Sequence, residues 1–314
     1  MNKKYKIAGI TLIVLALFAA LGVYLHGHSI PVLHPAGAVG QKERGLLIVG
    51  LLLSAIVVLP TFALTIFIAL RYRENNPKRS GKKIKYEPDF DHSPLFESIW
   101  WGVPILIIGI LSVVAWNSSH SLDPYKKLDA NKNQLVVQVV ALDWKWLFVY
   151  PEQHVASVNL AEIPVNTPVE FQVTSDTIMN SFWVPSLGGQ IYAMPGMITQ
   201  LHLMTDKAGS YFGSPANIAG KGFSRMDFTV RAGSQRDFNR WIATARTSSR
   251  TLNAAAYTVL SKPSMSVPVS YYSYVPDGFV TDVAMRYMAP GLPTPGSEAY
   301  TPSRGSSVTQ ESAL

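Results

Sequence analysis

The first 120 residues contain three long apolar runs without a charged residue, at positions 7–25, 46–70 and 99–116. A helix rises 1.5 Å per residue, so about 20 residues cross a hydrocarbon core about 30 Å thick. Each run is long enough to do so. The pattern therefore predicts three membrane-spanning helices in the N-terminal part of the chain.

The chain beyond residue 120 follows a different pattern. Short runs rich in β-branched and aromatic residues alternate with Pro, Gly, Asn and Asp, which is typical of strands joined by turns. These runs lie at 133–140, 144–150, 169–174, 200–204 and 226–230. The segment 122–231, about 110 residues, is long enough to bury a core of its own. We expect an all-β sandwich or Greek-key barrel.

A helical extension is predicted after the strands. In residues 234–246, Ser234 can cap a helix whose Phe238, Trp241 and Ile242 recur at three- and four-residue spacing. Further helical pieces are expected at 253–260 and 279–288. The last residues, 290–314, are rich in Pro, Gly and Ser and poor in apolar residues, which predicts a disordered tail.

The formal net charge of +7 belongs to the predicted membrane part of the chain. Residues 1–120 hold 12 Lys and Arg against 6 Asp and Glu, whereas residues 121–314 hold 15 against 14. Most of these basic residues lie before the first run and between the second and third. The positive-inside rule then places both segments in the cytoplasm and the chain after Trp116 on the outer face. A basic cluster between two spans argues against nucleic-acid binding.

Two interpretations of the first run remain open. It is longer than the 7–15 apolar residues of a signal peptide, which favours a retained helix. The small residues at 36–38 nevertheless offer a signal-peptidase site, and cleavage there would remove the first helix.

The segment 213–226 reads GSPANIAGKGFSRM, and the chain contains no cysteine. In length and glycine placement this segment resembles the copper-binding loop of subunit II of the haem-copper terminal oxidases. Copper-bearing members carry a histidine and, further along, the motif C-x-E-x-C-x3-H-x2-M. The corresponding positions here are Asn180, Pro215, Asn217, Ala219, Phe223 and Met226. Copper selects thiolate and imidazole ligands, so Met226 alone cannot hold a binuclear centre.

The residues that flank these positions still fit the family. They are Ser181, Phe182, Pro185, Gly188, Gly189, Gly196 and Gly220. The combination is similar to the cytochrome bo-type quinol-oxidase branch, in which subunit II lost its copper because quinol delivers electrons directly to subunit I. The resemblance covers about residues 30–290. It implies a membrane-anchored, all-β fold: N-terminal transmembrane helices, a cupredoxin-like Greek-key β-sandwich and a C-terminal helical extension.

The resemblance also implies the partners and cofactors. The complex would oxidise quinol, reduce oxygen to water and move protons outward across a bacterial inner membrane, with the sandwich in the periplasm. This chain would carry no cofactor and no metal; the haems, one copper and the quinol site would reside in subunit I. It would contact subunit I directly, join subunits III and IV, and bind the lipid bilayer, but neither nucleic acid nor cytochrome c.

The expected domains follow from these patterns. They are an N-terminal transmembrane segment or signal sequence at 1–28, a two-helix transmembrane hairpin with a basic cytoplasmic loop at 29–120, a cupredoxin-like periplasmic domain at 121–231, the helical extension at 232–289 and the tail at 290–314.

Glu97 is the one residue to which the resemblance assigns possible chemistry. It stands at the cytoplasmic start of the third run, where the helix dipole favours a carboxylate. The family motif places a glutamate here near the mouth of a proton pathway into subunit I. The two roles, helix cap and proton collector, remain open, because proton transfer requires a pKa near the working pH.

Four other residues have simpler expected roles. Trp144 and Trp146 are expected to pack across one face of a strand. His202 alternates with leucines, which predicts a surface position opposite to them. Met226 is expected to pack in the core.

Two alternatives of other classes remain. A copper-containing cytochrome c oxidase subunit would need the missing cysteine pair. A membrane-anchored cupredoxin-like binding module outside any oxidase complex would need a ligand pocket and no obligate partner.

Overall fold

The computed structural model describes residues 30–72, 92–128 and 133–287, together with positions 16, 20, 22 and 23. The chain divides into two compact units, one of residues 44–123 and one of residues 1–43 with 124–314. Most of the first apolar run, the basic loop at 73–91 and the predicted tail at 290–314 lie outside the described residues.

Two long helices correspond to the second and third apolar runs. They are α2, Ala38–Arg71, and α3, Pro94–Ser121. In each, the most apolar 18-residue window has none of its residues buried within the protein. A helix that is apolar on all sides needs an apolar surrounding, which for a helix of this length a lipid bilayer supplies. Both helices are long and apolar enough to cross a membrane.

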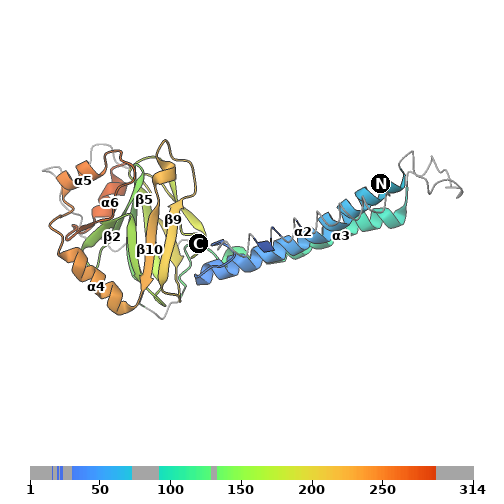
Figure 1. Ribbon diagram of the computed structural model, residues 1–314, viewed down its shortest axis with the longest axis horizontal. Helices are drawn as coiled ribbons and strands as arrows, with labels where there is room; N and C mark the ends of the chain where they lie inside the picture. Colours follow the sequence, from blue (N-terminus) through green and yellow to red (C-terminus); the bar gives the residue numbers. More distant parts are fainter. Residues whose placement is uncertain are drawn as a thin grey trace, which may run out of the picture. The chain divides into compact units, whose positions relative to one another are not determined.

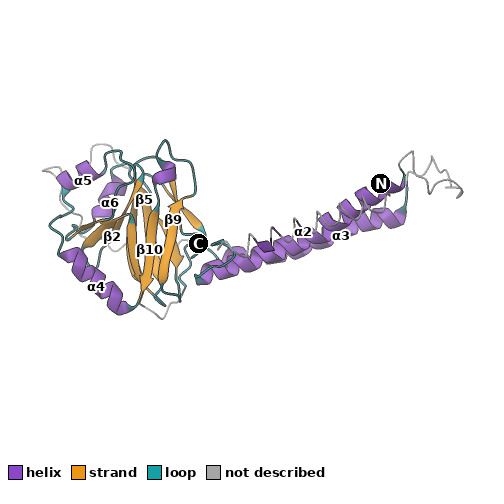
Figure 2. Cartoon of the chain, viewed as in Figure 1, coloured by secondary structure: helices purple, strands orange, loops and turns teal. Residues whose placement is uncertain are grey.

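The rest of the described chain is a two-sheet sandwich with flanking helices (Figures 1 and 2). One sheet has the order β11-β3-β2-β1-β5-β8 and the other β4-β10-β9-β6-β7. Neighbouring strands are antiparallel except for the parallel pairs β1–β5 and β4–β10. The strands are β1 Leu135–Leu142, β2 Lys145–Tyr150, β3 Val155–Val158, β4 Leu160–Pro164, β5 Val169–Ser175, β6 Asn180–Trp183, β7 Gln190–Ala193, β8 Thr199–Leu203, β9 Gly209–Pro215, β10 Phe228–Gly233 and β11 Ser270–Tyr272.

An aromatic cluster fills the space between the two sheets. Its members, Trp146, Phe148, Phe171, Phe182 and Phe228, are at most 3% exposed. The Phe182 and Phe228 rings stack with centroids 5.0 Å apart, and Trp146 lies 5.5 Å from each. Such pairs contribute about 0.5–1.5 kcal/mol each beyond the burial of their area. The cluster therefore ties β2 to β6 and β10 across the sandwich.

The helical extension begins with α4, Gln235–Arg246, as the sequence predicts. Ser234 and Asp237 form a reciprocal capping box, and Phe238, Trp241 and Ile242 are buried. The helix packs against β3, β4, β10 and β11. Its apolar stripe therefore covers strands of both sheets at one side of the sandwich (Figure 1).

The remaining extension covers the outer face of the six-stranded sheet. It contains α5, Ala254–Leu260, and α6, Phe279–Met285. A second apolar cluster joins side chains of β1, β2 and β3 to Leu252, Tyr257 and Phe279. Both faces of β1 and β2 are consequently covered, which explains why these strands read as continuous apolar runs rather than as an alternating pattern.

A short segment at the start of α2 is hydrogen-bonded to the sandwich. The amides of Ala36 and Gly37 donate to Ser186 O at 2.7 and 3.1 Å, and the Gly40 amide donates to Leu187 O at 3.0 Å. A Cβ on Gly37 would lie 2.1 Å from Leu187 O, so only glycine permits this approach. The start of α2 therefore belongs to the sandwich unit.

Candidate functional site

The loop that replaces the copper motif is held against the end of β6. Strands β6 and β9 pair with Phe182 opposite Pro215. Beyond this pair, the Ala216 amide donates to Ser181 O at 3.2 Å, and Asn217 Nδ2 donates to Met179 O at 3.0 Å. The fold thus brings the predicted positions on the two segments together, as a metal site would require.

The side chains at these positions do not fit copper. Asn180 is buried and donates to Ile178 O at 3.0 Å, while its Oδ1 and that of Asn217 find no hydrogen-bond partner among the described residues. Amide oxygens are hard, uncharged ligands, whereas copper selects thiolate and imidazole. Pro215, Ala219 and Phe223 offer no side-chain ligand. In the part of the chain that the structure describes, no three His, Cys, Asp or Glu side chains gather closely enough to bind a metal ion.

Two tryptophans fix the middle and the C-terminal end of the loop by hydrogen bonds. Trp144 Nε1 donates to Ala219 O at 2.8 Å, and Trp146 Nε1 donates to Met226 O at 3.0 Å. Met226 is 1% exposed, so its expected place in the core is confirmed. The backbone that would present ligands to a metal is therefore held by indole N–H groups instead.

The expectation that Trp144 and Trp146 share one face of a strand is wrong. Trp144 lies in the two-residue turn between β1 and β2, with φ of 61°, and its indole covers the loop. A Cβ on Gly222 would lie 2.3 Å from Trp144 Cδ2. The alternation of DWKWLFVY did not reveal the turn, because the left-handed region is unusual for a tryptophan.

A buried lysine connects this turn to the extension. Lys145 is 1% exposed, and its Nζ donates to Asp143 O at 3.2 Å, Lys262 O at 2.8 Å and Ser264 Oγ at 2.8 Å. Burial lowers the pKa of Lys145, an effect that the charge of Asp143 opposes. Lys145 was not predicted from the sequence; a charge between two tryptophans, Trp144 and Trp146, was the available signal.

His202 is buried, so its expected surface position is wrong. It is 3% exposed, and its Nδ1 lies 2.9 Å from Pro124 O. A carbonyl only accepts, so this nitrogen carries the ring proton. The side chain does face away from the leucines, but the segment around Pro124 covers that face of β8.

Glu97 lies in the first turn of α3. Its Oε1 accepts from the Ser93 amide at 3.3 Å and lies 3.4 Å from His92 Nδ1, and its side chain is 41% exposed. The hydrogen bond from the Ser93 amide is the expected capping contact. The geometry also places a second titratable group, His92, beside the carboxylate, which the sequence analysis did not single out.

Comparison with known proteins gives the family. The family model for the cytochrome c oxidase subunit II periplasmic domain matches residues 152–233, and the COX aromatic-rich motif matches residues 246–291. The fold class, with N-terminal helices, a cupredoxin-like sandwich and a helical extension, is confirmed. The periplasmic domain of cytochrome oxidase subunit II from Bradyrhizobium japonicum is 23% identical, with a TM-score of 0.35, over 38% of this chain and 95% of that chain.

Two curated relatives extend over most of the sequence. Cytochrome bo(3) ubiquinol oxidase subunit 2 of Pseudomonas putida is 45% identical over 256 residues, covering 81% of this chain and 80% of the relative. Ubiquinol oxidase subunit 2 of Acetobacter aceti is 44% identical over 280 residues, covering 87% of this chain and 89% of the relative. The chain therefore belongs to the subunit II family of the quinol oxidases, the copper-free branch of haem-copper oxidase subunits II that its loop resembles.

Proposed function

We propose that this chain is the non-redox subunit of a complex that oxidises quinol and reduces oxygen to water while moving protons outward. The observation that carries the proposal is the loop at 213–226, whose ligand positions are occupied by Asn, Pro, Ala and Phe and whose backbone is held by Trp144 and Trp146. Electrons have no route through such a loop. They would pass directly from quinol to the haems and copper of subunit I.

The remaining features give the chain a structural role. Helices α2 and α3 would span a bacterial inner membrane and contact subunit I, with subunits III and IV completing the complex. The sandwich would lie in the periplasm, in agreement with the family model that matches it. The extension would be a part of this outer domain, because it shares an apolar cluster with the six-stranded sheet.

Glu97 would in addition collect protons from the cytoplasm. Its carboxylate is part-exposed in the first turn of α3 and lies 3.4 Å from His92 Nδ1. Two titratable groups therefore lie side by side, and both are accessible to water. The competing role is the cap seen in the hydrogen bond from Ser93. A cap requires only an acceptor, whereas a proton collector must also bind and release a proton.

Purification through a tag on this chain tests the assignment. We expect haem to co-purify, and the complex to consume oxygen with quinol but not with reduced cytochrome c. Purification of the chain without haem would indicate a separate binding module, and turnover of cytochrome c would indicate the copper-bearing class. The relatives favour neither alternative.

Substitution of Glu97 separates its two roles. In Glu97→Gln, the amide oxygen still accepts from Ser93 but cannot titrate, so we expect normal haem content and slower quinol-driven oxygen consumption. Glu97→Asp should retain more activity than Glu97→Gln, because it keeps an ionisable group. Glu152→Gln, at an exposed glutamate of the sandwich, is the control and should turn over normally. Wild-type rates for Glu97→Gln across the pH range would leave the residue only its capping role.

A further inference from the structure

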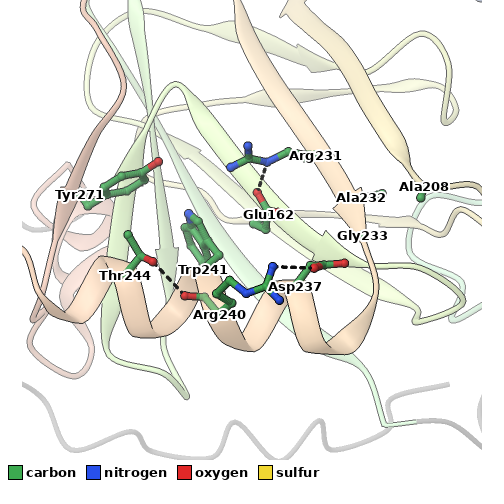
Figure 3. Close-up of a pocket in the computed structure, with 10 residues that line it drawn as sticks. All are labelled: Glu162, Ala208, Arg231, Ala232, Gly233, Asp237, Arg240, Trp241, Thr244 and Tyr271. Carbon is green, nitrogen blue, oxygen red and sulfur yellow. Dashed lines mark hydrogen bonds and ion pairs between the residues drawn. The ribbon is translucent and has the colours of Figure 1, made fainter.

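A pocket of about 480 Å³ lies between α4 and the strands β4, β10 and β11, and no residue of the copper-type loop at 213–226 is among those that line it. Figure 3 shows the side chains that matter for its chemistry. Arg231 and Glu162 come from the paired strands β10 and β4, Arg240 and Trp241 come from α4, and Tyr271 comes from β11. A volume of this size is typical of sites that bind small organic ligands.

The indole N–H of Trp241 is a donor that the described part of the chain leaves unused. Trp241 is 6% exposed, and its ring packs 4.8 Å from Tyr150 and 6.0 Å from Phe238, measured between centroids. Its Nε1 is buried and has no hydrogen-bond partner among the described residues. In Figure 3 the nitrogen-bearing edge of the indole and the Tyr271 hydroxyl face the same space as Arg231 and Glu162. Buried N–H groups are normally paired, so an acceptor from outside the chain would complete this site.

The charged groups around the indole leave donors in excess. Arg231 Nε donates to Glu162 Oε2 at 2.7 Å, and Arg240 Nη1 donates to Asp237 Oδ1 at 3.3 Å. Each of these ion pairs uses one of the five N–H donors of a guanidinium. The other oxygen of Asp237 already accepts from the amide and hydroxyl of Ser234. An incoming group would therefore meet more N–H and O–H donors than acceptors, although the second carboxylate oxygen of Glu162 also lies in the lining.

We propose that this pocket binds a small organic oxyanion, a phosphate ester or a carboxylate, whose oxygens accept from Trp241 Nε1, the Tyr271 hydroxyl and the free N–H groups of Arg231 and Arg240. Guanidinium groups match the geometry of both oxyanions. Because two arginines face two carboxylates, the net charge of the site is close to zero. Binding should then be weak, at about 0.1–1 mM, and should depend on hydrogen bonds more than on long-range attraction.

Calorimetric titration of the purified complex with three probes tests the proposal. Glycerol 3-phosphate, succinate and inorganic phosphate distinguish a phosphate ester, a carboxylate and a bare ion. Trp241→Phe removes the N–H donor and keeps a smaller aromatic ring in the core, and we expect it to weaken binding about 10-fold, as for a lost hydrogen bond to a charged group. Arg240→Gln should weaken binding by a similar factor. Arg236→Gln, an exposed arginine of the same helix that does not line the pocket, is the matched control and should bind as the wild type does.

Haem content and subunit stoichiometry check that each variant assembles. If Trp241→Phe fails to assemble, the comparison of Arg240→Gln with Arg236→Gln decides the question alone, because both side chains lie at the surface. The proposal is supported if either organic probe binds more tightly than inorganic phosphate and if this tighter binding is lost in Arg240→Gln. The absence of heat with all three probes overturns it. Equal binding by all variants indicates an adventitious ion only and overturns it as well. None of these outcomes depends on whether the complex oxidises quinol.

Discussion

A single buried carboxylate holds the last turn of the described extension against the sandwich. Asp176 directly follows β5, and its side chain is 2% exposed. Its Oδ2 accepts from the Tyr257 hydroxyl at 2.6 Å, and its Oδ1 accepts from the Tyr287 hydroxyl at 2.9 Å. The guanidinium of Arg286 forms an ion pair with the same carboxylate. Three side chains of the extension therefore converge on one residue of the sandwich.

Asp176→Asn should loosen this attachment severely. The amide keeps the size of the side chain, but it replaces one acceptor oxygen by an NH2 group that faces a hydroxyl donor. It also removes the counter-charge of Arg286, whose side chain is only 19% exposed. Breaking a buried ion pair by removing one partner costs about 3–5 kcal/mol. Since about 1.4 kcal/mol is a factor of ten, the opened population of the extension should rise at least about 100-fold.

Limited proteolysis of the purified complex measures this opening. Chymotrypsin should cleave Asp176→Asn within residues 246–287 much faster than the wild type, and mass spectrometry locates the cuts. Asp277→Asn is the control, because Asp277 lies in the same extension but its carboxylate is 72% exposed and pairs only with His154 Nδ1 at 3.2 Å. An exposed pair of this kind contributes about 0–1 kcal/mol. If the two variants were cleaved at equal rates, the attachment through Asp176 would be refuted.

Two further predictions concern the turn that covers the copper-type loop. Burial lowers the pKa of Lys145, so between this pKa and the ordinary value near 10.5 the unfolded chain binds more protons than the folded chain. The stability of the folded protein should therefore rise with pH in that window. Lys145→Met should remove this rise, measured as the thermal unfolding midpoint between pH 8 and 10. Gly222→Ala should destabilise the complex by about 1–3 kcal/mol, because its Cβ would lie 2.3 Å from the Trp144 ring. Gly222 has an ordinary φ of −102°, so backbone strain cannot produce that loss, and an unchanged unfolding midpoint would contradict the predicted clash.

The membrane helices and the longer strands were predictable because their signal is local. The windows that became α2, α3, β1 and β2 are mostly apolar, with exceptions such as Gln138 and Lys145, and no neighbour has to be known to place them. The N-terminal cap of α4 was equally local, since Ser234 and the stripe at Phe238 and Trp241 lie within eight residues. The strands β3, β4, β6, β7, β9 and β11 were missed. They are short or carry polar and small residues, and they are strands because of what they pair with.

The wrong expectations arose where a distant segment decides the environment. His202 alternates with leucines as a surface residue would. Pro124, 78 residues earlier, nevertheless covers it, and the Pro124 carbonyl accepts a hydrogen bond from its ring. Trp144 belongs to an alternating run, but its indole is directed to Ala219, 75 residues away. Lys145 is paired with the carbonyl of Lys262, 117 residues away. None of these partners can be found from the local pattern.

Direct hydrogen bonds hold the backbone of the copper-type loop. A binuclear centre would connect the end of β6 to the segment between β9 and β10. Here Asn217 makes that connection through Met179 O, and the two indole N–H groups hold the same segment against β2 and the turn before it through Ala219 O and Met226 O. Each such bond contributes only about 0.5–1.5 kcal/mol, but together they satisfy backbone carbonyls that would otherwise be left without partners. Loss of the metal therefore need not unfold the domain, and the loop can persist as a structural element after its electron-transfer role is gone.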